Sequence, residues 1–190
     1  MRVIAGRFKG MTLPAAKTGT RPTTDRTKEA LFSRLDALGL IEDARVLDLF
    51  AGTGALGIEA LSRGARELVA VESAGPAAAL LTKTLGSLHH QHEWQPGMSA
   101  RAMRRRAERF VADYAGAPFE LILIDPPYAF ATNECEELLT ALASGEATDD
   151  SSTIILERST RSQAPQPQES WGITDQRHYG ETAVFFIEPE

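Results

Sequence analysis

The sequence predicts an α/β fold in which helices cover a mostly parallel sheet. Short apolar runs alternate with helical segments along most of the 190 residues, and this alternation is typical of a doubly wound sheet. A glycine-rich segment follows the first apolar run, as expected where such a strand passes into a helix. Near the C-terminus, residues 173–179 and 182–187 are separated only by a short turn, which predicts an antiparallel hairpin.

The elements are expected in a regular order along the chain. Residues 2–13 alternate around glycines and predict a β-hairpin, and a helix is expected over 24–38 with Thr24 as its N-cap. Strands are predicted at 45–50, 68–72, 93–95, 120–124 and 153–157, and helices at 55–63, 76–87, 99–112 and 133–143. Residues 159–170 are rich in Pro, Gln and Ser and predict a loop.

Length and composition exclude several classes of protein. With 190 residues and 43% hydrophobic content, the chain suits one globular domain over 1–190. It shows no charged-then-apolar leader and no apolar run long enough to cross a bilayer, so we expect a cytoplasmic protein without membrane contact. Cys135 is the only cysteine, so we expect neither an internal disulfide nor a metal site.

The charge is distributed unevenly along the chain. The formal net charge is −6, yet residues 1–28 carry seven basic side chains and one acid, which leaves −12 for the remainder. Such asymmetry predicts contact with nucleic acid, although a solvated tail is the alternative. The candidate RNA-binding residues in this basic arm, 1–22, are Arg2, Arg7, Lys9 and Arg21. A second group, Arg101, Arg104, Arg105, Arg106 and Arg109, falls within the expected helix 99–112 and is interpreted as its solvated face.

A candidate catalytic turn follows the apolar run 121–124 and consists of Asp125, Pro126, Pro127 and Tyr128. Open α/β sheets bind ligands beyond the carboxyl ends of such strands. Each proline lacks an N–H and fixes its own φ at about −65°, so the turn is stiff. The Asp125 carboxylate and the Pro126 carbonyl can accept hydrogen bonds from an exocyclic amine while Tyr128 stacks on the ring. The alternative is a strand that simply ends at two prolines.

A candidate cofactor site lies at the first crossover. Gly52, Gly54 and Gly57 fit the pattern G-x-G-x-x-G, which allows close backbone approach to a ligand at a helix N-terminus. This pattern alone is compatible with NAD and with S-adenosylmethionine. Asp48 would repel a pyrophosphate and attract an ammonium group, which favours S-adenosylmethionine. Glu72 follows the first glycine by about 20 residues, the spacing of an acid that accepts ribose hydroxyls.

Segments 21–32, 48–64 and 125–128 together resemble one family, the bacterial 16S rRNA guanine-N2 methyltransferases of the RsmD type. Residues 2–13 are similar to that family's N-terminal hairpin, and the turn 179–182 is similar to its closing hairpin, so the resemblance covers nearly the whole chain. It implies a Rossmann-like, class I methyltransferase fold with a seven-stranded sheet, S-adenosylmethionine as methyl donor, and a guanine in 16S ribosomal RNA as target. The assembled small ribosomal subunit is the implied form of the substrate, and we expect a monomer.

The resemblance also implies further site residues, with 23–190 as the catalytic core. Thr23, Thr24 and Arg26 would lie beside the methionine end of the cofactor, and Ser73 against its adenine. Similar enzymes carry Asp or Asn before Ala at the end of the third strand, whereas this chain has no such pair after 93–95. We therefore expect Met98 and Ser99 to contact the adenine.

Two other functions remain open from the sequence. An N6-adenine DNA methyltransferase would share the turn 125–128, but 190 residues leave no room for a separate target-recognition domain. A nicotinamide-dependent oxidoreductase, or a non-catalytic relative, would share the glycine pattern, but Asp48 disfavours NAD.

Overall fold

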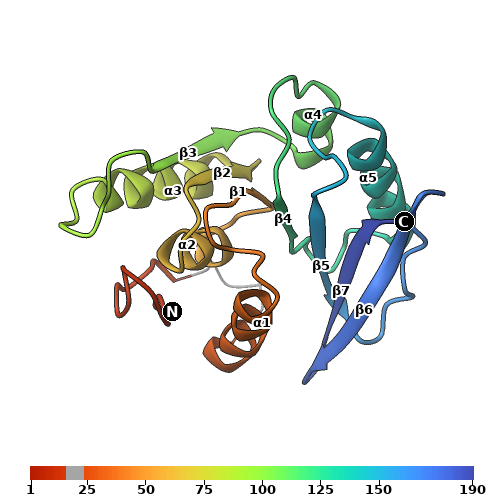
Figure 1. The fold of residues 1–190 in the computed structure, drawn as a ribbon, viewed down its shortest axis with the longest axis horizontal. Coiled ribbons are helices and arrows are strands. Elements are labelled where there is room, and N and C mark those ends of the chain that lie inside the picture. The colour runs from red at the N-terminus through yellow and green to blue at the C-terminus, as the bar shows by residue number, and fades with distance from the viewer. Residues whose placement is uncertain (16–23) are drawn as a thin grey trace.

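Seven strands and five helices are found among residues 1–15 and 24–190, the part of the chain that the computed structural model describes (Figure 1). The strands are β1 (Arg45–Leu49), β2 (Glu67–Glu72), β3 (Ser99–Arg104), β4 (Leu121–Ile124), β5 (Thr153–Ser159), β6 (Trp171–Tyr179) and β7 (Thr182–Pro189). The helices are α1 (Asp25–Ala37), α2 (Ala55–Ser62), α3 (Gly75–Leu88), α4 (Ala107–Ala112) and α5 (Thr132–Ser144). None of these helices is both long enough and apolar enough to cross a membrane.

All seven strands form one sheet in the order β3-β2-β1-β4-β5-β7-β6. Strands β1 to β5 are parallel, and β7 runs antiparallel to both β5 and β6. The chain builds outward from β1 to β3 and then returns to place β4 on the other side of β1. This reversal is a topological switch point, where open sheets bind ligands beyond the carboxyl ends of the strands.

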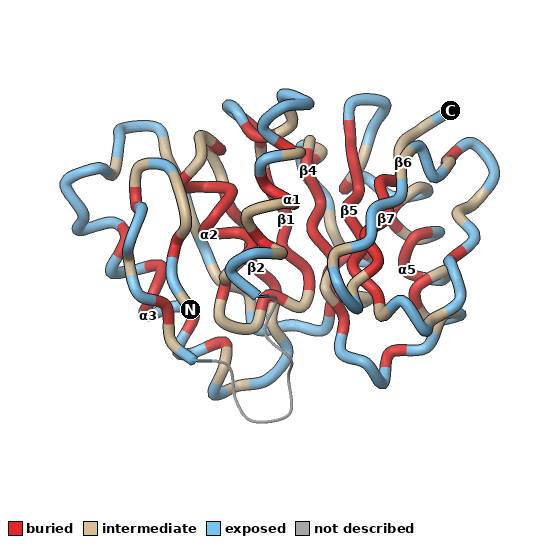
Figure 2. Tube along the Cα trace, turned by 90° about the horizontal axis from the view of Figure 1, so that it is seen from below, coloured by how far each residue is buried: buried red, intermediate tan, exposed pale blue. Residues whose placement is uncertain are grey.

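Two apolar layers bury both faces of the sheet. Successive strand residues point to opposite faces, so Val46 and Leu68 pack with α1, α2 and α3, whereas Leu47 and Val69 pack with α4 and α5. Figure 2 shows the buried positions concentrated along the central strands, with exposed positions in the outer loops. Burial on both faces explains why these strands have continuous apolar sequences.

The sequence prediction of a mixed seven-stranded sheet with a C-terminal antiparallel hairpin is confirmed. The expected loop over 159–170 contains no helix or strand beyond Ser159. Thr24 caps α1, since its hydroxyl accepts a hydrogen bond from the Thr27 N–H at 3.2 Å.

The third strand and the following helix were placed incorrectly from the sequence. The strand occupies Ser99–Arg104 rather than 93–95, and the helix is limited to Ala107–Ala112 rather than 99–112. Strand β3 lies at the edge of the sheet, so it has no continuous apolar run: Ala100 and Ala102 pack on the α3 face and Met103 on the other. Pairing with β2 therefore outweighs the weak local pattern.

The N-terminal hairpin predicted for 2–13 is not formed. The structure has a single antiparallel bridge between Arg2 and Thr12. The Ile4 and Ala5 N–H groups donate to the Glu59 carboxylate, at 2.9 and 3.1 Å, so they are not available for strand pairing. The segment 1–13 is thus a loop held against α2.

A buried ion pair connects this loop with two helices. Lys28 of α1 and Glu59 of α2 lie 3.3 Å apart, and both side chains are fully buried. The Lys28 ammonium also donates to the Arg2 carbonyl at 2.7 Å, while Glu59 accepts from Arg63 at 2.9 Å. Because every charge is matched by a hydrogen-bonding partner, the N-terminal loop, α1 and α2 are held as one unit.

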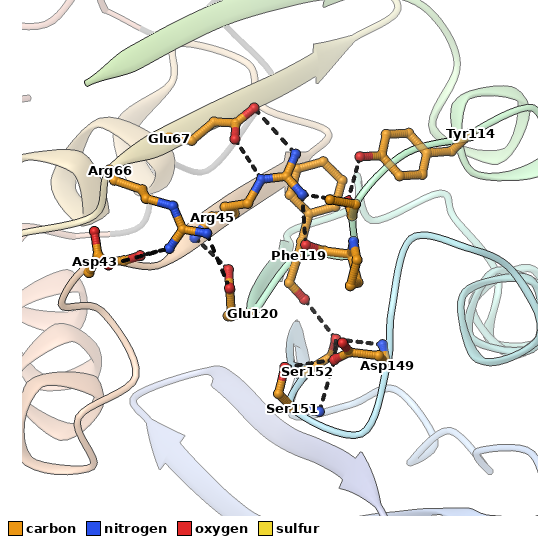
Figure 3. A network of polar contacts seen from close by, with 12 residues as sticks. Asp43, Arg45, Arg66, Glu67, Tyr114, Phe119, Glu120, Asp149, Ser151 and Ser152 are labelled. Atoms are coloured by element: carbon orange, nitrogen blue, oxygen red, sulfur yellow. Dashed lines mark hydrogen bonds and ion pairs between the residues drawn. The ribbon is translucent and has the colours of Figure 1, made fainter. Parts of the chain in front are cut away.

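A polar network connects the strands at the amino-terminal edge of the sheet, opposite to the edge where the strands have their carboxyl ends (Figure 3). The Arg45 guanidinium contacts Glu67 at 2.6 Å, and the Arg45 N–H donates to the Glu120 carboxylate at 2.7 Å. Arg66 reaches Glu120 at 3.3 Å. These bonds tie the starts of β1, β2 and β4 together, which fixes their register and therefore aligns their carboxyl ends.

Candidate active site

Three acidic side chains follow or end neighbouring strands at the switch point. Asp48 lies near the end of β1, Glu72 ends β2, and Asp125 comes directly after β4. The parallel register places Asp48 beside Ala70 of β2 and Leu123 of β4. The site thus collects negative charge from three elements that are distant in the sequence.

Asp48 is the most perturbed of these acids. Its side chain is buried, and its Oδ2 accepts a hydrogen bond from the Gly57 N–H at 2.9 Å. Burial, together with the nearby charges of Asp125 and Glu72, raises the pKa of Asp48 to about 7 against the opposing effect of the Gly57 hydrogen bond. A positively charged ligand beside Asp48 would favour its ionised form.

Asp125 shares this environment. Burial also raises the pKa of Asp125 above its ordinary value. Two carboxyl groups with raised pKa values at one edge of a sheet are characteristic of a functional site. The site is therefore suited to a cation and to a group that exchanges a proton.

The glycine loop approaches this edge through left-handed backbone conformations. Gly52 and Gly54 have φ values of 54° and 80°, which glycine adopts without strain. The Glu72 carboxylate braces the loop, because its two oxygens accept from the Gly52 and Ala74 N–H groups, each at 2.8 Å. Glu72 therefore shapes the loop in addition to its expected role toward a ribose.

Gly57 is required for close packing of α2 on the sheet. A Cβ at this position would lie 2.5 Å from Leu68 Cδ1 and 2.9 Å from Asp48 Oδ2. Any larger residue would push α2 away from β1. The third glycine thus brings the helix N–H close enough to hold Asp48.

The turn 125–128 presents an aromatic ring to solvent. Tyr128 is 66% exposed, which leaves its ring faces accessible for stacking. Two hydrogen bonds fix the end of this turn. The Phe130 N–H donates to the Pro127 carbonyl at 2.9 Å, and the buried Arg158 of β5 donates to the Phe130 carbonyl at 2.8 Å. The Phe130 ring also meets the edge of Phe50 with centroids 5.0 Å apart.

Phe50 itself has a strained backbone. Its φ is 62°, a left-handed conformation that is unusual for an aromatic residue. Such conformations occur preferentially at functional sites, where the surrounding structure holds them. Phe50 directly precedes the glycine loop and turns the chain from β1 into it.

A cavity of about 420 Å³ opens beside these elements. It is lined by Phe50, Ser73, Arg106, Ala107, Glu108, Pro127, Phe130 and Glu134. The lining thus includes residues that follow β1, β2, β3 and β4, all at the carboxyl edge of the sheet. Ser73, expected to lie against the adenine, is among the lining residues.

Arg106 and Ala107 were missed as site residues because the third strand was misplaced. They follow β3 and line the cavity. An Ala thus does follow the third strand, but Arg106 rather than Asp or Asn precedes it. This pair would have been found had the strand been assigned to Ser99–Arg104.

Met98 and Ser99 lie outside the candidate site, which corrects the expectation that they contact an adenine. Ser99 pairs with Glu67 at the amino-terminal start of β2. The Met98 sulfur accepts a hydrogen bond from Arg7 at 2.8 Å. Because β3 is parallel to β2, these residues are at the edge opposite the glycine loop.

The remaining sequence-predicted residues are spread over the N-terminal third of the chain. Thr24 caps α1 and Arg26 is exposed on its first turn, whereas Thr23 and Arg21 lie outside the described residues. Of the basic residues expected to contact RNA, Arg2 is exposed and pairs with Asp25 at 3.7 Å, and Lys9 is exposed. Arg7 donates to Gln95 at 3.3 Å.

The sheet order, the glycine loop and the acids at the carboxyl ends of β1 and β2 define a class I S-adenosylmethionine-dependent methyltransferase. The fold matches that of magnesium protoporphyrin IX methyltransferase from Synechocystis, solved with bound S-adenosylmethionine, over 87% of this chain and 79% of that chain. The TM-score is 0.64 at 14% identity, so this match concerns the fold alone.

The family follows from closer relatives. Residues 1–188 match the family described as "Conserved hypothetical protein 95". The chain is 33% identical to "Ribosomal RNA small subunit methyltransferase D" of Escherichia coli, covering 100% of this chain and 90% of the relative. The solved structure of the yhhF protein from Escherichia coli matches 100% of this chain and 98% of its own, with a TM-score of 0.83 and 30% identity. The chain belongs to the RsmD family of S-adenosylmethionine-dependent methyltransferases.

S-adenosylmethionine is the cofactor, and the residues of the site fit it. The buried Asp48 lacks a cationic partner among the groups that shift its pKa, all of which are carboxylates or a backbone N–H. A sulfonium compound with an ammonium group supplies that missing charge. NAD would instead bring a pyrophosphate to the same carboxylate, which argues against an oxidoreductase.

Proposed function

We propose that this protein transfers the methyl group of S-adenosylmethionine to the exocyclic N2 of a guanine in 16S ribosomal RNA of the small ribosomal subunit. One observation carries the proposal: an exposed Tyr128 follows closely on Asp125, a carboxylate near enough to Asp48 to raise its pKa. The family supports an RNA target, since its Escherichia coli member is named as a methyltransferase of small-subunit ribosomal RNA.

The cofactor is proposed to lie across the carboxyl ends of β1, β2 and β3. Asp48 would attract its ammonium group, Gly52 and Gly54 would allow close backbone approach, and Glu72 would accept its ribose hydroxyls. Ser73, with Arg106 and Ala107 across the cavity, would face the adenine. Thr23, Thr24 and Arg26 remain candidates for the methionine end. Bound here, the cofactor supplies a methyl group already activated by its sulfonium charge.

The target amine is proposed to be held by the turn after β4. The lone pair of guanine N2 is delocalised into the ring, so the amine is a poor nucleophile until acceptors grip its N–H groups. Asp125 and the Pro126 carbonyl would accept those hydrogen bonds, and the stiffness of Pro126-Pro127 would fix their direction. Alignment of amine and methyl group then contributes most of the catalysis. The raised pKa of Asp125 suits it to accept the released proton.

Tyr128 is proposed to stack on the target base after that base leaves its own stack. Base stacking on an aromatic side chain is worth roughly 1 to 3 kcal/mol in nucleic-acid sites. The Tyr128 ring is available for this contact because most of its surface is exposed. Replacing the ring by Phe would keep the stacking, whereas replacing it by Ala would remove it.

The identity of the product tests the proposed function. Small ribosomal subunits from cells that lack this enzyme are incubated with the protein and labelled S-adenosylmethionine, and the RNA is digested to nucleosides. We expect the label in N2-methylguanosine. Label in N6-methyladenine would favour the adenine methyltransferase instead. Parallel reactions with naked 16S ribosomal RNA show whether the assembled subunit is needed.

The Asp125→Asn variant tests the catalytic assignment. Asn keeps the size of the side chain but cannot accept a proton, so we expect transfer to fall by roughly 10²- to 10⁴-fold. Circular dichroism and cofactor affinity should stay close to those of the unmodified protein. Asp43→Asn, at a largely exposed acid, is the matched control and should retain full activity. Full activity of Asp125→Asn would contradict the assignment.

We also propose how the domain, the oligomeric state and the basic arm of this protein serve the reaction. A single methyltransferase domain over 1–190 would act as a monomer in the cytoplasm, where its ribosomal substrate is found. The basic arm 1–22, with Arg2, Arg7, Lys9 and Arg21, would contact the RNA around the target.

A further inference from the structure

Five arginines line the outer edge of β3 and the turn that follows it. Arg101 and Arg104 lie on β3, Arg105 and Arg106 in the turn, and Arg109 on α4. All five are exposed. Figure 1 shows β3 as the outermost strand on this side of the sheet, beyond β2. We call this surface the arginine edge.

Neighbouring acids offset part of the charge of this edge. Residues 99–109 contain five arginines and one acid, which gives +4 in a chain whose net charge is −6. Arg105 pairs with Asp113, and Arg106 pairs with Glu108 at 3.3 Å. Arg101 lies near enough to Glu67 to lower the pKa of that carboxyl.

The other two arginines have fewer polar contacts. The Arg104 guanidinium lies against Gly75 at the start of α3, about 3.0 Å from where a Cβ would stand. For Arg109, the structure shows no ion pair or side-chain hydrogen bond with any residue of 1–15 or 24–190. Arg104 and Arg109 thus have no ion pair among the described residues and remain available for an anionic ligand.

The arginine edge connects the N-terminal loop with the cavity. At the amino end of β3, Arg7 donates to Gln95 and to the Met98 sulfur. At the carboxyl end, Arg106 lines the cavity. Along the strand, Arg101 and Arg104 are separated by three residues, or roughly 10 Å. Because these two positions are an odd number of residues apart, Arg101 and Arg104 point to opposite faces of the sheet. Positive charges therefore flank both faces of its outer edge and end at the candidate active site.

Protection of the sheet edge does not account for the whole arrangement. Charged side chains on an edge strand prevent pairing with another chain, and this would explain Arg101. The arginines continue past the end of β3 into the turn and α4, where there is no strand edge to protect.

We propose that the arginine edge binds the phosphate backbone of the RNA that flanks the target base. This inference rests on the proposed function. Guanidinium groups bind phosphates through two parallel hydrogen bonds. Outside residues 1–28, which carry +6, and 99–109, which carry +4, the chain has a net charge of −16 and repels RNA, so contact along the positive edge also orients the substrate. The RNA enters alongside β3 and reaches the cavity at Arg106.

The double variant Arg101→Gln/Arg109→Gln tests the inference without touching the cavity lining. The control is Arg161→Gln/Arg177→Gln, which removes the same charge from exposed positions after β5 and on β6 at the other edge of the sheet. Binding of a short fluorescein-labelled RNA hairpin is measured by anisotropy between about 50 and 200 mM salt. We expect several-fold weaker binding for the edge variant and a salt slope smaller by about 2. The control should bind like the unmodified protein.

Two further measurements separate this inference from the proposed function. Affinity for S-adenosylmethionine should be the same in all three proteins, which shows that the fold is intact. The KM for unmethylated small subunits should rise in the edge variant while kcat changes little. If the product proves to be N6-methyladenine in RNA, the proposed function fails and the arginine edge still stands. Equal RNA affinity in the edge and control variants would overturn the inference. So would a loss of affinity for polyglutamate, a polyanion without phosphate groups, as large as the loss of affinity for RNA.

Discussion

Asp48 shows how one residue couples ionisation to ligand binding. Its carboxyl is buried beside two further acids, and its pKa of about 7 means that protonation competes with a cationic ligand in the neutral range. In the ligand-free protein the neutral form of Asp48 predominates below about pH 7. Because this pKa is raised above that of an unfolded aspartate, the stability that Asp48 contributes is lost as the pH rises through about 7, and a cationic ligand beside Asp48 would offset this loss.

We predict that S-adenosylmethionine affinity falls as the pH is lowered through about 7, because the ligand prefers the ionised Asp48. For one linked proton the limiting slope is about tenfold in Kd per pH unit. Calorimetry measures the Kd between pH 8.5 and pH 5.5, two limits that each lie roughly 1.5 units from the pKa of Asp48. Asp48→Asn should bind more weakly and lose this dependence. An unchanged Kd across the range would contradict the assignment.

Arg158 contacts the candidate catalytic turn from the neighbouring strand β5. It is buried at the end of β5 and donates to the Phe130 carbonyl. We predict that Arg158→Met lowers kcat by roughly 10- to 100-fold, because a displacement of about 1 Å in a reacting group can cost that much. Cofactor affinity should fall much less than kcat, since neither Arg158 nor Phe130 forms a hydrogen bond with the glycine loop in the described residues, although Phe130 lines the cavity.

Two comparisons separate positioning by Arg158 from a general loss of stability. Arg158→Lys keeps a cationic donor and should recover part of kcat, whereas a purely structural defect would also change cofactor affinity. Arg161→Met, at an exposed position two residues after β5, should behave like the unmodified protein. A variant Arg158→Met with normal kcat would remove Arg158 from the mechanism.

At the scale of elements, the N-terminal loop is fixed by one close approach to α2. Gly6 has a φ of 81°, and a Cβ there would lie 2.0 Å from the Ser62 carbonyl oxygen. Gly10 has a φ of 86°, but a Cβ there would meet no atom within 4 Å. The two glycines thus share a backbone conformation and differ in their surroundings.

We predict that Gly6→Ala detaches the loop from α2, whereas Gly10→Ala causes only the backbone strain of about 1 to 2 kcal/mol common to both. Hydrogen exchange of the Ile4 and Ala5 amides, which donate to Glu59, reports detachment directly. Fast exchange in Gly6→Ala and slow exchange in Gly10→Ala is the expected result. Equal protection in both variants would show that the loop does not depend on this contact.

Edge position explains the element that sequence reasoning misplaced. A central strand such as β4 is buried on both faces and has a continuous apolar sequence. The edge strand β3 has small and charged residues instead, and its weak pattern resembles that of an amphipathic helix. Because the third strand was assigned to 93–95, two further expectations depended on the wrong position. Met98 and Ser99 were expected to contact the adenine, and the arginines of 101–109 were expected to lie on a helix.

For the molecule as a whole, the buried pair of Lys28 and Glu59 joins three separate parts of the chain. We predict that Glu59→Gln lowers the free energy of unfolding by about 3 to 5 kcal/mol, because Lys28 would keep a buried charge without its counterion. Urea denaturation measures this loss. Asp36→Asn breaks an ion pair to Arg63 at a half-exposed position and should cost less than about 1 kcal/mol. Equal losses in the two variants would contradict the role of burial.

The sequence by itself determined the α/β class, the parallel centre of the sheet, the C-terminal hairpin, and the segments that carry the glycine loop and the turn after β4. These features depend on local properties: continuous burial, backbone freedom at glycine, and the stiffness of consecutive prolines. Such properties leave a direct pattern in the residues themselves.

Only the tertiary structure decided where β3 lies, that the N-terminal segment is a loop, and that Arg106 reaches the cavity. Each depends on partners distant in the sequence: β2 pairs with β3, Glu59 takes the amides of the N-terminal loop, and four strand ends surround the cavity. The free energy of these contacts comes from burial and hydrogen bonding between remote residues, which no local pattern records.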